Sequence, residues 1–298
     1  MVLHLKKILV TGSGGFIGKS LCNRLNQYKD YYDVFTLDRS VGGIRHIQAD
    51  ITSDDLSKKF RTINPNVIVH LAGNVSVPFS IKNPFEDFNV NARGTLAVLL
   101  GAEHTDCRNF IFVTSGGAIY DSTAGLPLTE ESPINPISPY GLSKYIAEGY
   151  VRVLSEGRVS GWSSLALSNT YGSVKMLKRG VIYKFWEDIS NGIAPTIFGA
   201  EVSRDFIHID DVVDALIKVI ETPVNTRLNI SSNTSTKLVD LQAEMQQILG
   251  SSFKPVIFDV PLGEVGVSEL SNKKAQELLN WKPQVDLFWG LRNAISVN

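Results

Sequence analysis

The chain has 298 residues, of which 43% are hydrophobic and 20% charged, enough to form one large core or two unequal domains. The net charge of −1, with no dense run of Lys and Arg, argues against non-specific nucleic-acid binding, which depends on many phosphate contacts. Cys22 and Cys107 match no metal-ligand or redox spacing, so we predict no metal site and a reducing compartment. The N-terminus becomes glycine-rich too early for a signal peptide, and no apolar run reaches the ~18 residues of a membrane span, so we expect a cytoplasmic protein.

Short runs rich in Val and Ile alternate with longer segments of helical periodicity in the first 170 residues. The predicted strands are 7–12, 33–38, 66–73, 109–115 and 162–169, and the predicted helices are 16–28, 53–63, 89–104 and 140–156. Strands that are apolar on both faces and alternate with helices are typical of a doubly wound parallel α/β sheet.

The order becomes less regular after about residue 170. Helices are predicted at 178–191, 209–221, 236–249 and 271–280, with short strands at 195–198 and 227–230. We therefore expect a first domain at 1–170 and a smaller α/β domain at 171–298, with the segment 200–230 returning to the first domain.

The stretch "VTGSGGFIG" follows the first predicted strand and opens the first helix, which is the context of a dinucleotide-binding loop in a Rossmann-type sheet. Backbone N–H groups and the helix N-terminus would hold a pyrophosphate there. The residues expected at this contact are Gly12, Gly14, Gly15, Phe16, Ile17 and Gly18. Asp38 ends the next strand, and its carboxylate would accept from a ribose 2′-hydroxyl and repel a 2′-phosphate, which favours NAD. Arg39 beside it keeps NADP open.

The stretch "SPYGLSK" places Tyr140 and Lys144 four residues apart, on one face of a helix. An ammonium next to a phenol favours the phenolate and lowers a pKa that starts near 10. Such a tyrosine could exchange a proton near neutral pH, although the same spacing also occurs in ordinary exposed helix pairs.

Five segments, "TGSGGFIG", "HLAG", "NARGT", "YGLSK" and "RDFIHIDDV", occur in an order that resembles the extended short-chain dehydrogenase/reductase family. The resemblance covers nearly the whole chain. It implies a Rossmann domain that binds NAD(P) and a smaller C-terminal domain that closes over a nucleotide-diphosphate sugar. It makes Tyr140 the acid/base and Lys144 its partner, which also bonds the nicotinamide ribose. The same resemblance places Asp50 and Ile51 near adenine, assigns Leu71, Ala72 and Gly73 to a turn beside the cofactor, and gives Asn91 a structural role.

The third catalytic position departs from the family pattern. A Ser or Thr is usual four residues before the tyrosine of the "VYG"-like turn, and counting back from Tyr120 reaches Gly116. We favour Ser115, with Thr114, a water or the substrate's own hydroxyl as alternatives. The Asp-Glu pair of the 4,6-dehydratases is also missing, so dehydration is ranked low.

On the substrate side, the resemblance assigns Asn169 in "SNTYG" to the sugar diphosphate and Arg204 in "SRDFIHIDDV" to a phosphate. Leu262 stands near the place of a second phosphate-binding arginine, so one anchor is missing. Lys178 or Arg179 could compensate, or could be solvated loop residues.

The resemblance is strongest to NAD-dependent nucleotide-sugar 4-epimerases, in which a 4-keto sugar is formed and reduced again. The alternatives are an NAD(P)H-dependent 4-keto-6-deoxysugar reductase, a UDP-uronate decarboxylase, and a non-catalytic protein that senses the cofactor. Helices matching 89–104 and 140–156 commonly pair in the family, so a homodimer is expected.

Overall fold

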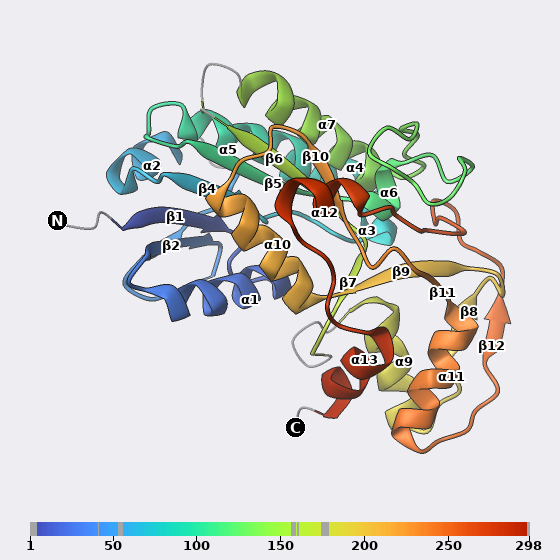
Figure 1. Ribbon diagram of the computed structural model, residues 1–298. Coiled ribbons are helices and arrows are strands. Elements are labelled where there is room, and N and C mark those ends of the chain that lie inside the picture. Colours follow the sequence, from blue (N-terminus) through green and yellow to red (C-terminus); the bar gives the residue numbers. More distant parts are fainter. Residues whose placement is uncertain are drawn as a thin grey trace.

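The computed structural model describes residues 5–40, 42–52, 56–155, 159, 161–173 and 179–296, and a seven-stranded parallel sheet forms its centre (Figure 1). The strand order is β10-β6-β5-β4-β1-β2-β3. The strands are β1 (Lys6–Thr11), β2 (Tyr32–Asp38), β3 (His46–Gln48), β4 (Val67–His70), β5 (Asn109–Ser115), β6 (Trp162–Leu167) and β10 (Arg227–Ile230). The order reverses between β1 and β4, which is the switch point where doubly wound sheets bind ligands. The predicted α/β fold class is confirmed.

Helices cover both faces of this sheet (Figure 1). On one face lie α2 (Leu56–Ile63), α5 (Gly94–Ala102) and α7 (Pro139–Ser155), and on the other α1 (Phe16–Leu25), α10 (Ile209–Glu221) and α12 (Lys273–Leu279). Alternation along β1 produces this division, because Ile8 and Val10 pack on the α1 and α10 side while Leu9 packs on the other. None of the described helices is long and apolar enough to cross a membrane.

The C-terminal part forms its own layers at one end of the large sheet (Figure 1). Three strands pair in the order β11-β9-β7, and two more form the pair β12-β8. These strands are β7 (Asn169–Tyr171), β8 (Thr196–Phe198), β9 (Ser203–His208), β11 (Ser235–Lys237) and β12 (Val256–Phe258), and the helices are α9 (Gly180–Ser190), α11 (Leu238–Leu249) and α13 (Leu287–Ser296). A separate core including Tyr171, Phe185 and Met245 joins them. Strand β10 pairs with β6 in the large sheet, while the domain boundary at residue 170 stays a prediction.

Several elements near the sheet edge differ from the predicted ones. The predicted strand 66–73 ends at His70, because the chain then turns and Leu71 N donates to Thr11 O at 3.1 Å. The predicted helix 89–104 begins with a π-helical turn, Asn89–Arg93. Before it stand two short helices that were not predicted, α3 (Val77–Lys82) and α4 (Pro84–Phe88), and a further one, α6 (Gly116–Ile119), follows β5. The first two have proline in their first turn, where its missing N–H costs nothing.

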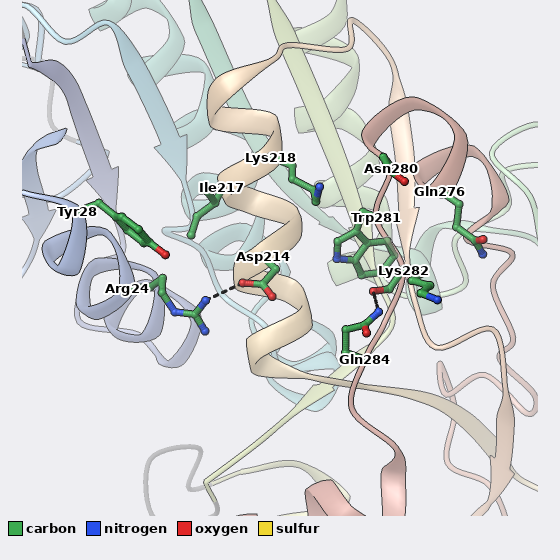
Figure 2. Close-up of a pocket in the computed structure, with 10 residues that line it drawn as sticks. All are labelled: Arg24, Tyr28, Asp214, Ile217, Lys218, Gln276, Asn280, Trp281, Lys282 and Gln284. Carbon is green, nitrogen blue, oxygen red and sulfur yellow. Dashed lines mark hydrogen bonds and ion pairs between the residues drawn. The ribbon is translucent and has the colours of Figure 1, made fainter. Parts of the chain in front are cut away.

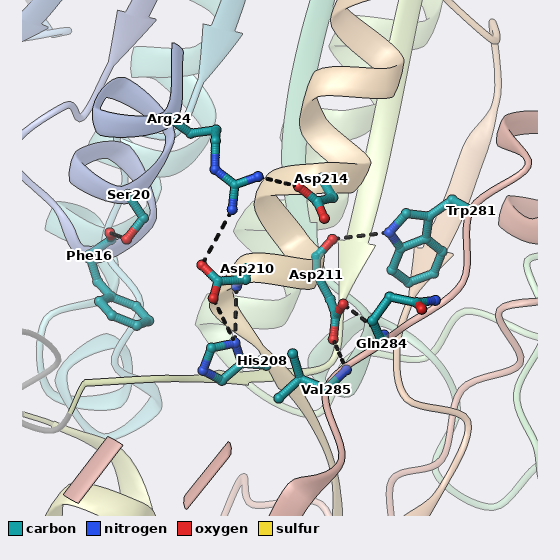
Figure 3. Close-up of polar contacts among 10 residues, drawn as sticks. All are labelled: Phe16, Ser20, Arg24, His208, Asp210, Asp211, Asp214, Trp281, Gln284 and Val285. Atoms are coloured by element: carbon teal, nitrogen blue, oxygen red, sulfur yellow. Dashed lines mark hydrogen bonds and ion pairs between the residues drawn. The ribbon is translucent and has the colours of Figure 1, made fainter. Parts of the chain in front are cut away.

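The start of α10 ties the C-terminal segment to the large sheet (Figure 3). The buried Asp211 carboxylate accepts from Gln284 N at 2.8 Å and from Val285 N at 3.1 Å, and the Asp211 carbonyl accepts from the Trp281 indole at 3.1 Å. Burial raises the pKa of Asp211, and these two backbone donors oppose the shift. These contacts give Asp211 a structural role at this junction.

Candidate active site

Two glycines of the loop between β1 and α1 occupy positions that a larger residue could not take. Gly12 has φ +68°, and a Cβ on it would lie 2.5 Å from Ala72 N, while a Cβ on Gly18 would lie 2.3 Å from Gly12 O. Gly15 is the N-cap of α1 and offers no side chain to the first N–H groups of the helix. These donors and the positive end of the helix dipole are therefore left for an anion.

Asp38, at the end of β2, lies directly against this loop. Its carboxylate accepts from Gly14 N at 3.0 Å and from the Ser40 hydroxyl at 3.1 Å. Burial acts to raise the pKa of Asp38, but the hydrogen bonds from Gly14, Ser40 and Arg39 outweigh it and the net pKa is lowered. An ionised carboxylate thus stands beside the glycine loop, with the exposed Arg39 next to it.

The other predicted cofactor residues surround the same edge of the sheet. Asp50 is exposed and accepts from Thr52 N at 2.9 Å. Ile51 is buried against α5, where a Cβ on Gly94 would come within 2.7 Å of it. Leu71 and Ala72 pass beside β1, and a Cβ on Gly73 would lie 3.9 Å from Lys144 Nζ. This turn therefore lies between the glycine loop and Lys144.

Tyr140 and Lys144 stand at the start of α7, each 8% exposed. Tyr140 N donates to the Ser80 hydroxyl at 3.1 Å, and Lys144 Nζ lies 4.2 Å from the centroid of the Phe112 ring. Burial lowers the pKa of Lys144 to about 8, and the carboxylates of Glu148 and Asp87 limit the shift. The lysine stays largely protonated at neutral pH in spite of its burial.

Ser115 ends β5 and, through a hydrogen bond with the Tyr140 phenol, lowers the pKa of that phenol. Burial acts more strongly and raises the pKa of Tyr140, with Asp87 acting in the same direction and Arg179 opposing it. Thr114 is buried, and its hydroxyl has no hydrogen-bond partner among the described residues. Of the two hydroxyls, that of Ser115 acts on the Tyr140 phenol.

The predicted substrate residues lie on the small sheet. Asn169 begins β7 and is exposed. Arg204, on β9, is mostly buried and donates to the carbonyls of Ser203 at 2.9 Å and Gly266 at 3.1 Å, and its guanidinium lies 3.5 Å from the Glu264 carboxylate. Burial lowers the pKa of Arg204, and Glu264 opposes the shift.

Leu262 stands near the position where the family has a second phosphate-binding arginine, and its side chain cannot bind a phosphate. Leu262 is 88% exposed there. Of the two compensating residues that we considered, Lys178 lies outside the described residues. The charge of Arg179 acts on the Tyr140 phenol, so Arg179 stands on the side of the candidate site.

Comparison with known proteins decides the family. The model of the NAD dependent epimerase/dehydratase family matches residues 8–231. This chain belongs to that family. A protein of Methanocaldococcus jannaschii named putative UDP-glucose 4-epimerase is 34% identical over 301 residues, with 97% of each chain covered. The solved UDP-glucose 4-epimerase of Thermotoga maritima with UDP-glucose is 30% identical at a TM-score of 0.91, again with 97% of each chain covered.

A second solved structure bears on the cofactor. The UDP-glucuronic acid 4-epimerase of Bacillus cereus in complex with UDP-glucuronic acid and NAD is 26% identical at a TM-score of 0.88, covering 97% of this chain and 98% of that chain. The described residues fit such a cofactor, because a Cβ on Gly12 or Gly18 would fill the turn and Asn74 Nδ2 is buried without a partner beside Gly73. The predicted class, an NAD-dependent nucleotide-sugar epimerase of this family, is confirmed.

A cavity of about 480 Å³ lies between α1, α10 and the segment that follows α12 (Figure 2). It is lined by Arg24, Tyr28, Asp214, Ile217, Lys218, Gln276, Asn280, Trp281, Lys282 and Gln284. None of the predicted site residues lines it. Arg24 is paired with Asp214 at 2.8 Å, and the Trp281 indole is already bonded to a carbonyl. It is a groove where the C-terminal segment packs against α1 and α10 rather than part of the epimerase site.

Sequence reasoning missed the polar groups behind α7. Asp87 is fully buried and accepts from Ser143 at 2.6 Å, and Glu148 forms a two-pronged ion pair with Arg227 at 2.7 and 2.9 Å. Glu148 stands one turn after Lys144, which was a usable signal. Asp87 lies in "NPFEDFN", where no sequence pattern distinguishes this buried residue from the exposed Glu86 next to it.

Proposed function

We propose that this protein inverts the configuration at C4 of a UDP-hexose. The observation that carries the proposal is the hydrogen bond between Ser115, at the end of β5, and the Tyr140 phenol, with the buried Lys144 one turn further along α7 and next to Gly73. The similarity to proteins named UDP-glucose 4-epimerase supports the position C4 and the uridine nucleotide.

In this proposal Tyr140 removes the proton from the 4-hydroxyl and later returns it. Bound NAD supplies a reversible acceptor for the C4 hydride. Burial alone would keep the phenol protonated, so ionisation depends on the Ser115 hydrogen bond and the charge of Arg179, both of which lower the pKa of Tyr140. In the proposal the Lys144 ammonium, one turn further along α7, also favours the phenolate. The residues that hold NAD would be the glycine loop, Asp38 and the turn 71–73, with Lys144 donating to the nicotinamide ribose.

The sugar diphosphate would be held from the small sheet. Asn169 is exposed at the start of β7 and free to donate its amide to a phosphate. Arg204 would bind the diphosphate after its 3.5 Å ion pair with Glu264 is broken. Each charge-assisted contact of this kind contributes about 1.5–3 kcal/mol. Arg179 is the candidate for the missing second anchor.

The direct test incubates the purified protein with UDP-glucose, UDP-galactose and UDP-glucuronic acid without added cofactor, following the anomeric protons by NMR. Inversion at C4 supports the proposal. A requirement for stoichiometric NAD(P)H would identify a 4-ketoreductase, and loss of CO₂ from the uronate would identify a decarboxylase. Failure to convert any of them, with NAD bound, would favour the non-catalytic alternative.

The matched pair of variants is Tyr140→Phe and Tyr145→Phe, because Tyr145 lies on the same helix and is 38% exposed. Tyr140→Phe should lower kcat by at least ~10³-fold while NAD binding is kept, since only the proton-transfer group is lost. Tyr145→Phe should retain wild-type turnover.

We also propose that two copies pair through α4, α5 and α7. The support is a set of exposed apolar side chains on these helices, namely Phe85, Phe88, Leu100, Leu142, Tyr145, Tyr150 and Val153. Light scattering of Val153→Glu against the wild type tests it: a dimer that becomes a monomer supports the proposal, and a wild-type monomer contradicts it. We place the activity in the cytoplasm, which suits two free, buried cysteines.

A further inference from the structure

Asp87 on α4 is a fully buried carboxylate directly behind the predicted reaction centre. It is 0% exposed, and both of its oxygens are engaged. The Ser143 hydroxyl donates to Oδ2 at 2.6 Å, and Asn91 Nδ2 donates to Oδ1 at 3.1 Å. Two donors and no acceptor partner fit the ionised form, because a protonated carboxyl would need to donate as well.

These two donors connect Asp87 to both sides of the site. Ser143 stands between Tyr140 and Lys144 in the sequence, and its hydroxyl also lies 3.0 Å from the Tyr140 carbonyl, so it fixes the first turn of α7. Asn91 Oδ1 accepts from Asn74 N at 2.8 Å, and Asn74 follows the turn that passes the cofactor. The Asp87 carboxylate is thus linked through Ser143 to α7, which carries the proposed acid/base Tyr140, and through Asn91 to Asn74 in the loop after β4.

The charge of Asp87 acts on both members of the tyrosine–lysine pair. It raises the pKa of Tyr140, and it partly offsets the burial that lowers the pKa of Lys144. Burial raises the pKa of Asp87 itself, and the bonds from Ser143 and Asn91 and the charge of Lys144 oppose this.

Three other charged or titratable groups surround the tyrosine–lysine pair. Glu148, on α7, raises the pKa of Lys144 more than Asp87 does, but its carboxylate is also held in an ion pair with Arg227 of β10. His70, on β4, is held between Thr11 and Thr95, and burial lowers its pKa to about 3, so it is neutral. Arg179 acts on the phenol from the C-terminal part. Among the described groups that act on Tyr140 or Lys144, Asp87 is the buried anion whose direct hydrogen-bond partners are all neutral.

We propose that Asp87 is a positioning residue of the reaction centre, which anchors the first turn of α7 through Ser143 and supplies the negative charge that balances the Lys144 ammonium. This inference rests on the proposed roles of Tyr140 and Lys144. The consequence that distinguishes this role is a shift of the pH range over which Tyr140 and Lys144 titrate, because Asp87→Asn keeps the shape and one of the two acceptor oxygens but removes the charge. Both the tyrosine and the lysine should then lose protons at lower pH.

The first experiment requires no turnover. Tyrosinate absorbance near 295 nm is titrated in the NAD-bound protein, and the curve of Tyr140→Phe is subtracted to isolate Tyr140. In Asp87→Asn the Tyr140 midpoint should fall by about half a pH unit or more. Glu86→Gln is the matched control, since it removes an equal charge from the neighbouring but exposed residue, and it should leave the midpoint unchanged. An unshifted midpoint in Asp87→Asn overturns the proposal even if the enzyme epimerises sugars.

The second experiment follows UDP-galactose turnover against pH. Both limbs of the kcat profile should move to lower pH in Asp87→Asn, with KM changed less than kcat, whereas a merely structural role would lower activity equally at every pH. Ser143→Ala provides a test if Asp87→Asn does not fold: it should lower kcat with KM kept and leave the limbs in place, and wild-type kcat would overturn the anchoring role. A shifted tyrosinate midpoint without any sugar turnover would leave this inference standing while the proposed function fails.

Discussion

The candidate site and the junction at the start of α10 are two polar regions of the fold that differ in how completely protein partners satisfy their polar and charged groups. At the junction, the Asp211 carboxylate has two backbone donors at 2.8 and 3.1 Å, and Arg24 pairs with Asp214 at 2.8 Å (Figure 3). The polar groups there are matched by protein partners, so they contribute to the cohesion of the fold.

At the candidate site, some buried polar groups lack a complementary partner among the described residues. Lys144 faces an aromatic ring in place of a carboxylate, and Asn74 Nδ2 is buried without a partner among the described residues. Groups that the protein leaves poorly compensated are available to a ligand, at a cost to the stability of the fold. The comparison therefore predicts that substitutions at the site change the rate and those at the junction change the stability.

The largest expected effect is that of Lys144→Met. Activity should fall by at least ~10³-fold, because the phenolate loses its cation. The free energy of unfolding should rise by about 1–3 kcal/mol at pH 7, since the folded pKa of about 8 lies below the 10.5 of an unperturbed lysine. That penalty is complete below pH 8 and disappears as the pH rises toward 10.5, so the gain should shrink over this interval in urea titrations.

The control is Lys218→Met, at the cavity beside the junction. It should leave the turnover number unchanged. If Lys144→Met instead destabilised the fold at pH 7, the lysine would be a structural cation and the contrast between the two regions would be lost.

Asp211→Ala is the corresponding substitution at the junction. It leaves the N–H groups of Gln284 and Val285 without their acceptor, and we expect the free energy of unfolding to fall by about 2–4 kcal/mol. Turnover per folded molecule should be retained at temperatures where the variant is folded. Thermal unfolding and active-site titration measure the two quantities separately, and a drop in kcat with unchanged stability would reverse the assignment.

Sequence patterns were sufficient for the parts of the fold that repeat a period. The strands β1, β2, β4, β5, β6 and β10 and the helix α10 follow from apolar runs and helical spacing, with ends displaced by a few residues. The short helices α3, α4 and α6 and the strands β3, β7, β9, β11 and β12 were missed, because three to six residues do not complete a detectable period. Their positions depend on tertiary contacts instead.

Some residues of the candidate site could likewise be predicted from the sequence, and others could not. The glycine loop, Asp38 and the pair Tyr140 and Lys144 carry local spacing that reports their chemistry. The choice between Ser115 and Thr114 depended on how β5 ends, which no local pattern records. Asp87 was missed for a similar reason, since its burial comes from α7, more than fifty residues later in the chain.

A smaller effect is expected from His70, the buried neutral imidazole under the site. Its folded pKa of about 3 lies below the 6.5 of an unperturbed histidine, with burial as the main cause and Lys144 adding to it. The unfolded chain therefore takes up a proton between pH 6.5 and about 3 that the folded chain does not. Relative to His70→Gln, the wild type should lose about 1.4 kcal/mol of stability per pH unit as the pH falls through this interval. Equal slopes of stability against pH in the wild type and His70→Gln would contradict this.

The smallest expected effect is that of Arg24→Ala, which tests how much of the junction's stability comes from its outer ion pairs. Arg24 lies 2.8 Å from Asp214 and 3.7 Å from Asp210, but its side chain is 29% exposed and those of its partners 44% and 58%. Water and salt screen such pairs, so we expect a loss of about 0.5–1 kcal/mol that diminishes at high ionic strength. Urea unfolding at low and high salt measures it. A loss above ~2 kcal/mol that salt does not reduce would mean that the arginine stem, packed at the cavity, stabilises the junction more than its charge does.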